Sequence, residues 1–294
     1  MSGPSPRALP TMNPHEYEIM FRVEDRYWWY RGMRALCRSL LPEAFDAGRP
    51  LRLLDAGCGT GANLAHVRSG SRGPGFVCGV DLSPDALRYC RRRGLSALAR
   101  GSVTSLPFAD GAFDLVTCHD VLYTVPDDVE AIGELARVLS PGGLLYLTVA
   151  AFESLRGEHD RAVHGLRRYR RRDLGEKLEA AGLTVERATY ANACLAPAIW
   201  LHRRVRSLLA RADRDAEAAS DFPFLPRFLD AILYALLRAE AAVATRVRLP
   251  FGVTLAVRAR KRYGAPRHEA LSGAGVDFPA NSIAHPRTRE RRFP

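Results

Sequence analysis

The chain has few lysines, no paired cysteine motif and no long apolar run. Of its 43 basic residues only Lys177 and Lys261 are lysines, so arginine carries most of the positive charge behind the formal net charge of +11. A GC-rich coding sequence produces the same bias, and net charge bears on association rather than on fold. The charge alone therefore does not make nucleic acid an expected partner.

The six cysteines are scattered along the chain and form no C-x-x-C pair. This argues against a disulfide framework or a zinc site, and it fits a reducing compartment. No apolar run reaches the roughly 18 residues that span a bilayer. The proline-rich start of the chain also lacks the apolar segment of a secretory signal. We therefore expect a cytoplasmic protein without a transmembrane segment or bound metal.

What the chain does contain is a regular alternation of strand and helix patterns. The 294 residues are 47% apolar, which is enough for a sizeable core. Strands are expected at 51–57, 76–82, 96–100, 113–122, 144–152, 183–190 and 252–261, and helices at 83–94, 127–143 and 172–181. This alternation predicts an α/β, Rossmann-like sheet built from right-handed strand–helix–strand units.

Composition also suggests how the chain is divided. We expect a disordered leader at 1–13, an N-terminal helical cap at 14–45, a main domain at 46–262 and a flexible basic tail at 263–294. Within the main domain, 191–250 is a mostly helical, arginine-rich insertion before the last strand. Three roles are open for it: a lid over a substrate pocket, a homodimer face, or a surface for a membrane or a lipid-like substrate.

A glycine-rich turn follows the first expected strand. Gly57, Gly59 and Gly61 have the spacing G-x-G-x-G, which differs from the G-x-G-x-x-G of dinucleotide sites. The acidic Asp55 comes just before them, and Asp81 ends the second strand. A carboxylate at the position of Asp81 can accept hydrogen bonds from both ribose hydroxyls of an adenosine.

Four ordered segments carry a family resemblance. LLDAGCGTGANL (53–64), VDLSPDAL (80–87), LPFADGAFDLV (106–116) and ELARVLSPGG (134–143) resemble the motifs of class I S-adenosylmethionine-dependent methyltransferases. The resemblance covers roughly residues 20–262. It implies S-adenosyl-L-methionine as the cofactor and a seven-stranded, mostly parallel sheet whose last strand is antiparallel.

The resemblance also implies a set of cofactor-binding residues. They are Asp55, Ala56, Gly57, Gly59 and His119 for the methionine part, Asp81 and Leu82 for the ribose and adenine, Ser102 and Val103 for the adenine, and Arg31 for the carboxylate. Many relatives have an acidic residue where this chain has Ser102, which leaves the contact to the adenine amine open.

A narrower resemblance is to a bacterial subgroup with a YWW-x-R-G cap and an H-D-x-x-x-H-x-x-R-R-Y loop, matched here at 27–32 and 159–169. The chain departs from that subgroup in having Tyr123-Thr124 where many relatives have Glu-His, which shifts the expected general base to the loop. The expected catalytic residues are His159, His164, Asp160 and Tyr169, and the expected substrate-binding residues are Tyr27, Trp29, Tyr123 and Arg168.

Each of these assignments has a structural alternative. The loop histidines can serve as metal ligands with Asp160 or simply hydrogen-bond within the loop. The arginines at 167–172 can grip an anionic acceptor or form a solvated helix entry. The aromatic residues at 27–30 can be core packing rather than a cover for the cofactor.

The expected function is methylation of O or N on a small-molecule acceptor, a specialised metabolite or sugar-linked compound of bacterial natural product biosynthesis. One alternative is a nucleic-acid methyltransferase, against which the fourth strand ends in HDVLY rather than N/D-P-P-Y. Another is a non-catalytic cofactor-binding protein. We expect no nucleic-acid partner, and we leave a homodimer and peripheral membrane contact open.

Overall fold

The computed structural model describes residues 12–46, 50–70, 75–157, 160–161, 163–201 and 225–264. Most of the expected leader, most of the expected tail and the middle of the expected insertion therefore lie outside the described residues. So does His159, one of the two histidines expected to act as a base.

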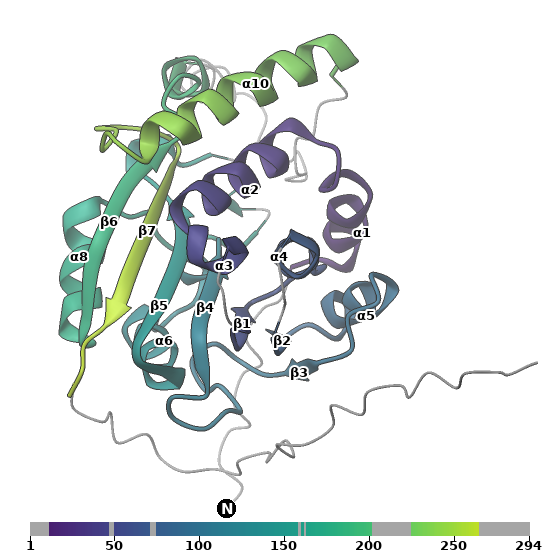
Figure 1. The fold of residues 1–294 in the computed structure, drawn as a ribbon. Helices are drawn as coiled ribbons and strands as arrows, with labels where there is room; N and C mark the ends of the chain where they lie inside the picture. The colour runs from purple at the N-terminus through teal and green to yellow at the C-terminus, as the bar shows by residue number, and fades with distance from the viewer. Residues whose placement is uncertain are drawn as a thin grey trace, which may run out of the picture.

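Seven strands form one sheet in the order β3-β2-β1-β4-β5-β7-β6 (Figure 1). The strands are β1 (Leu53–Ala56), β2 (Val77–Asp81), β3 (Leu98–Arg100), β4 (Phe113–His119), β5 (Leu139–Ala150), β6 (Leu183–Ala191) and β7 (Thr254–Lys261). The first five pair in parallel, and β7 is antiparallel to both β5 and β6. This confirms the expected fold. Because the strand order reverses beside β1, the carboxyl ends of β1 and β4 border the crevice where such sheets bind ligands.

Helices cover both faces of the sheet (Figure 1). One face carries α6 (Asp128–Val138) and α8 (Arg171–Ala180). The other carries α2 (Trp28–Leu40), α3 (Pro42–Asp46), α4 (Ala62–Gly70), α5 (Pro84–Arg92) and the end of α10 (Arg227–Ala244). The short α1 (Pro14–Val23) packs on α5. Two 3-10 turns, η1 (Leu122–Thr124) and η2 (Glu153–Leu155), follow β4 and β5.

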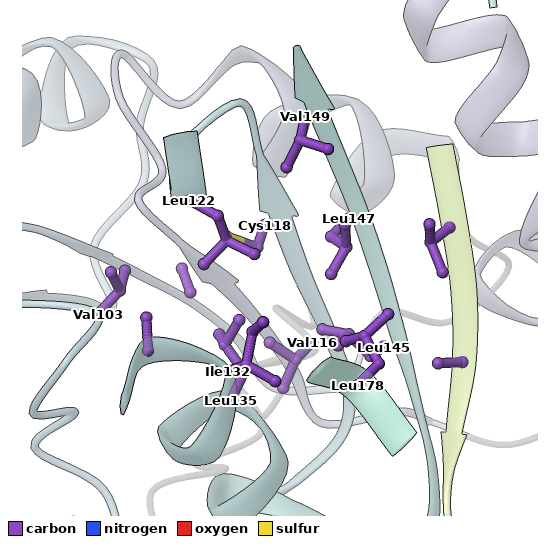
Figure 2. Packing of buried hydrophobic residues seen from close by; sticks show 14 of the residues in the cluster. Val103, Val116, Cys118, Leu122, Ile132, Leu135, Leu145, Leu147, Val149 and Leu178 are labelled. Carbon is purple, nitrogen blue, oxygen red and sulfur yellow. The ribbon is translucent and has the colours of Figure 1, made fainter. Parts of the chain in front are cut away.

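The strands divide their apolar side chains between two cores because successive residues point to opposite faces. One core combines Val116, Leu145 and Leu147 with side chains of α6 and α8, among them Ile132, Leu135 and Leu178 (Figure 2). The second contains the neighbouring strand residues, Leu115, Leu144 and Tyr146, packed with α2 to α5. Both faces of the central strands are therefore buried, as near-continuous apolar runs predict.

Two expected boundaries were wrong. The helix expected at 127–143 ends at Val138, because Leu139 already pairs with Phe113 in the sheet and Pro141 has no N–H for a helix interior. The strand expected at 113–122 ends at His119, because Asp120 adopts a positive φ of 55°. The second correction places Asp120 on a sharp turn at the carboxyl end of β4.

The insertion contributes α10, which lies along α2 (Figure 1). The Asp230 Oδ1 accepts the backbone N–H of Trp28 at 2.8 Å, so α10 caps the N-terminus of α2, where Tyr27 provides no side-chain cap. The helices approach so closely at Gly32 that a Cβ there would lie 2.4 Å from Leu237 Cδ1. The insertion thus sets the position of the cap.

We expect Gly32→Ala to lower the free energy of unfolding by about 1–3 kcal/mol, because the added methyl group must push α2 and α10 apart. Gly175→Ala is the matched control, since a Cβ at that position in α8 would meet nothing within 4 Å. That change should stabilise the protein by about 0.5–1 kcal/mol. Urea unfolding measures both, and equal effects of the two substitutions would contradict the close packing inferred at Gly32.

Candidate active site

The glycine turn after β1 adopts the left-handed backbone that glycine permits. Gly57 and Gly59 have φ values of 75° and 53°, and a Cβ on Gly57 would lie 2.4 Å from Val121 Cγ2. The N–H of Gly59 donates to Asp81 Oδ2 at 2.8 Å. The turn therefore brings the backbone close to the end of β2, with no side chain between them.

Asp81 lies at the centre of this edge. Its Oδ1 accepts the N–H of Ser83 at 2.9 Å, and burial raises its pKa from the ordinary value. The carboxylate keeps lone pairs beyond these two bonds, and the residue is only partly buried. Leu82 follows it and is also partly buried. Both therefore keep exposed surface at the carboxyl edge of the sheet, and their contacts with the ribose and adenine stay predictions.

Asp55 and Ala56 lie deeper, at the end of β1. Both are buried, and the hydroxyl of Thr117 donates to Asp55 Oδ1 at 2.7 Å. Burial raises the pKa of Asp55 to about 7, and the nearby charge of Asp81 acts in the same direction. Asp55 therefore supports the glycine turn from beneath, and its predicted contact with the cofactor stays a prediction.

The residues expected to contact the adenine follow β3. The Ser102 hydroxyl accepts the N–H of Thr104 at 3.2 Å and shares a 2.8 Å hydrogen bond with the Thr104 hydroxyl. Val103 is buried in the core with Val80 and Phe108. Ser102 is thus already engaged in a local turn, and the adenine roles of both residues stay predictions.

The cap helix α2 carries the arginines Arg31 and Arg34, and the predicted role of Arg31 at the cofactor's carboxylate stays a prediction. Arg31 pairs with Asp230 at 3.3 Å, and its guanidinium lies 3.8 Å from the centroid of the Tyr234 ring. Arg34, three positions on and on nearly the same helix face, donates from Nη2 to the Glu24 carbonyl at 2.7 Å. Its Nη1 is buried without a hydrogen-bond partner.

The charge of Arg34 reaches the carboxyl end of β4. Burial, followed by the charge of Arg34, lowers the pKa of His119 to about 4. His119 is therefore neutral near pH 7, with its ring centroid 5.5 Å from that of Tyr146. Sequence reasoning missed Arg34 because the YWW-x-R-G motif directed attention to Arg31. The helical spacing from Arg31 was the signal available.

Glu24, in the link between α1 and α2, joins the cap to the glycine turn. Its carboxylate accepts hydrogen bonds from the hydroxyl of Thr60 and from Arg93 Nη2, the latter at 2.6 Å. Arg93 also donates from Nε to the carbonyl of Thr60 at 3.0 Å. Burial raises the pKa of Glu24, while the pairing with Arg93 favours the charged form. This buried pair fixes the cap over the glycine turn.

The first cap helix adds a cover over the end of β2. Tyr17 of α1 is buried beside Ser83, and burial together with the charge of Asp81 raises the pKa of Tyr17 to about 12. The Met20 Cε lies 3.1 Å from where a Cβ of Gly59 would be. Helix α1 therefore encloses the glycine turn and Asp81 from outside the sheet.

Asp120 directly follows His119, on the turn after β4. Burial raises its pKa to about 6, while the neighbouring Thr148 hydroxyl and the charge of Arg168 oppose that shift. The Thr148 hydroxyl is nevertheless buried without a hydrogen bond of good geometry. Burial raises the pKa of Tyr30 and Tyr123, and in both the charge of Asp120 adds to the effect. These three residues therefore lie close together at the end of β4.

The loop after β5 is built around a buried ion pair. Arg168 binds Asp160 through two hydrogen bonds of 2.8 and 2.9 Å, and the same carboxylate accepts the N–H of Gly157 at 2.7 Å. The Tyr169 hydroxyl donates to Asp128 at 2.6 Å and is buried. These partners give Asp160, Arg168 and Tyr169 structural roles in the loop, and their catalytic or substrate-binding roles stay predictions.

The remaining expected residues are distributed around the site. His164 is exposed on a turn with a positive φ of 56°. Tyr27 precedes α2, and Trp29 packs edge-on against Tyr30 with ring centroids 5.0 Å apart. Within the described residues, no group of three or more His, Cys, Asp and Glu side chains is arranged to hold a metal ion.

A family model described as a methyltransferase domain matches residues 54–147. A demethylmenaquinone methyltransferase of Beutenbergia cavernae is 34% identical over 165 residues, which are 52% of this chain and 68% of that protein. A ubiquinone biosynthesis O-methyltransferase of Xanthomonas oryzae is 32% identical over 163 residues, 50% of this chain and 66% of that protein. Of two other curated relatives, the chain spans only 35% and 30% of the length.

The fold is also found among solved structures. A chain from the complex between the Haloferax volcanii Trm112 methyltransferase activator and a methyltransferase has a TM-score of 0.54 and 23% identity, with 88% of this chain and 96% of that chain covered. An S-adenosylmethionine-dependent methyltransferase of Thermotoga maritima has a TM-score of 0.50 and 17% identity, with 84% and 96% covered. Together with the sheet order and the glycine turn, the sequence matches show that the chain belongs to the class I S-adenosylmethionine-dependent methyltransferases.

Proposed function

We propose that the protein transfers the methyl group of S-adenosylmethionine to an oxygen or nitrogen of a small-molecule acceptor in the cytoplasm of a bacterium. We further place the chain in the subgroup with the YWW-x-R-G cap and the H-D-x-x-x-H-x-x-R-R-Y loop. The acceptor class proposed is a specialised metabolite or a sugar-linked compound. Two relatives, a ubiquinone biosynthesis O-methyltransferase and a demethylmenaquinone methyltransferase, have names that denote small-molecule acceptors.

The orphaned Nη1 of Arg34 carries the proposal, because it is a buried cationic donor on a side chain bonded to Glu24, whose carboxylate in turn binds Thr60 of the glycine turn. A buried guanidinium donor without a partner is costly, and a carboxylate satisfies it with a charge-assisted hydrogen bond. The amino-acid end of S-adenosylmethionine has such a carboxylate. Asp81, on the other side of Gly59, offers its remaining lone pairs to the ribose hydroxyls. The residues present thus fit both ends of the cofactor.

S-adenosylmethionine supplies an activated methyl group on a sulfonium, so the protein needs mainly to align the acceptor and exclude water. His119, which the resemblance assigns to the methionine part of the cofactor, is neutral near pH 7 and would add no positive charge to that of the sulfonium. Tyr17 and Met20 of α1 cover the turn against solvent. In our proposal these side chains only hold and enclose the cofactor, and none of them needs to change its protonation state.

We propose Asp120 as the residue that accepts the acceptor's proton. Its pKa of about 6 leaves it largely ionised at neutral pH while keeping it basic enough to take a proton. It stands on the turn after β4 and is only partly buried, with Tyr30 and Tyr123 beside it. His164, the histidine of the loop that the structure describes, is exposed to solvent instead.

The acceptor class is tested by incubating the purified protein and tritiated S-adenosylmethionine with fractions of bacterial extract. Label should enter the small-molecule fraction and remain absent from RNA, DNA and protein. Label in RNA or DNA would contradict the proposed class and favour a nucleic-acid methyltransferase. Tight cofactor binding without label in any fraction would favour a non-catalytic binding protein.

We expect Arg34→Gln to raise the dissociation constant for S-adenosylhomocysteine about 10- to 100-fold, because a charge-assisted hydrogen bond is lost. Affinity for 5′-methylthioadenosine, which lacks the amino-acid carboxylate, should stay unchanged. Isothermal titration calorimetry measures both. Arg31→Gln is the matched control and should change neither affinity more than about threefold, since Arg31 is engaged by Asp230. A reversed pattern would restore Arg31 as the carboxylate contact.

With an active acceptor in hand, kcat/KM should rise as pH increases through about 6, because Asp120 must lose its proton before it can accept one. Asp120→Asn should lower kcat about 10²- to 10⁴-fold and remove this limb of the profile. Asparagine tolerates the positive φ at this position, so the turn is expected to persist. An unchanged limb in the variant would show that another group is the base.

A further inference from the structure

The outer face of α10 is apolar and exposed. Phe228, Ile232, Leu236 and Val243 are 68%, 58%, 36% and 48% exposed. Their spacing of four, four and seven residues places them on one stripe of the helix. We call these four residues the α10 patch. The opposite stripe, with Leu237 and Ala241, is buried toward the cap and the sheet. In Figure 1, α10 lies at the outside of the molecule, beyond α2.

The exposed charges on α10 and directly after it have one sign. Arg227 and Arg238 on the helix, and Arg246 and Arg248 just after it, are all exposed. The two acidic residues of α10 are turned away from this face by their bonds. Asp230 caps α2, as described above.

Glu240, the second acidic residue, is only 8% exposed and accepts the N–H groups of Asn192 and Cys194 at 2.5 and 3.2 Å. The outward surface of α10 therefore combines apolar and cationic side chains without a described exposed carboxylate on the helix. That combination is what an interfacial helix presents to anionic lipid, with apolar groups in the headgroup layer and arginines on the phosphates.

We propose that the α10 patch docks the protein onto an anionic lipid surface. The charges disfavour a second copy of the chain, because a two-fold interface through this face would bring the same arginines together. None of the described helices is long and apolar enough to cross a bilayer. The proposed contact is therefore peripheral, and it does not depend on the identity of the acceptor.

The test is flotation of the full chain with phosphatidylcholine vesicles, with and without about 30% phosphatidylglycerol. Wild-type protein should float only with the anionic vesicles, and the bound fraction should fall as salt is raised. The double variant Ile232→Glu and Leu236→Glu should weaken binding about tenfold or more, because two apolar side chains no longer enter the headgroup layer. Arg238→Gln with Arg246→Gln should weaken it about fivefold for each arginine.

The control for an added glutamate is Val129→Glu, which places one such charge on a valine of α6 about as exposed as Ile232 and should float like wild type. Unchanged affinity for S-adenosylhomocysteine shows that each variant is folded. The proposal is overturned if wild-type protein ignores anionic vesicles or binds neutral ones equally well, or if Val129→Glu fails to float. It is also overturned if light scattering shows a wild-type dimer that the Ile232→Glu and Leu236→Glu variant dissociates, because the patch is then a self-association face.

Discussion

The buried ion pair of Glu24 and Arg93 is the contact on which the arrangement of the site depends. The carboxylate of Glu24 receives Arg93 and the hydroxyl of Thr60, while its carbonyl receives Arg34. Glu24 thus binds the cap to the glycine turn and also holds Arg34, the arginine that we propose for the cofactor's carboxylate. Removing one partner would leave the other charge buried without compensation, which typically costs about 3–5 kcal/mol. The cap is therefore bound to the sheet domain at the point where the cofactor is expected.

Two neighbouring residues at the carboxyl edge of the sheet differ in their titration: the pKa of His119 is lowered, and that of Asp120 is raised. In our proposal Asp81 and the neutral His119 serve the cofactor, and Asp120 serves the acceptor. The positive φ of Asp120 is what turns the chain away from β4 directly after His119. Strain of this kind is kept where the surrounding structure holds it in place, and here the Asp120 N–H donates to the Thr148 carbonyl of β5 at 2.9 Å.

Helix α10 combines an internal and an external role. Its inner side caps α2 through Asp230 and packs on Gly32, so it stabilises the helix that carries Arg34. Its outer side presents the α10 patch. Because both acidic residues serve the inner contacts, the outer surface is left with apolar and cationic groups alone. Of the three roles left open by the sequence for this insertion, our proposal takes up the lipid surface, while the lid and the homodimer face stay open.

The sequence by itself determined the sheet, the glycine turn and the position of Asp81, because these depend on local patterns: apolar strands, glycine spacing and a carboxylate at a strand end. The motif at 27–32 also located the cap. What only the tertiary structure decided is which groups meet. Arg31 pairs with Asp230, nearly 200 residues away, and the charge of Arg34 contributes to the lowered pKa of His119. Asp160 pairs with Arg168, and the Tyr169 hydroxyl donates to Asp128. Asp120, by contrast, has a pKa that burial raises. Burial leaves Nη1 of Arg34 without a hydrogen-bond partner and raises the pKa of Asp120. Neither burial nor long-range pairing can be recognised from a local sequence motif.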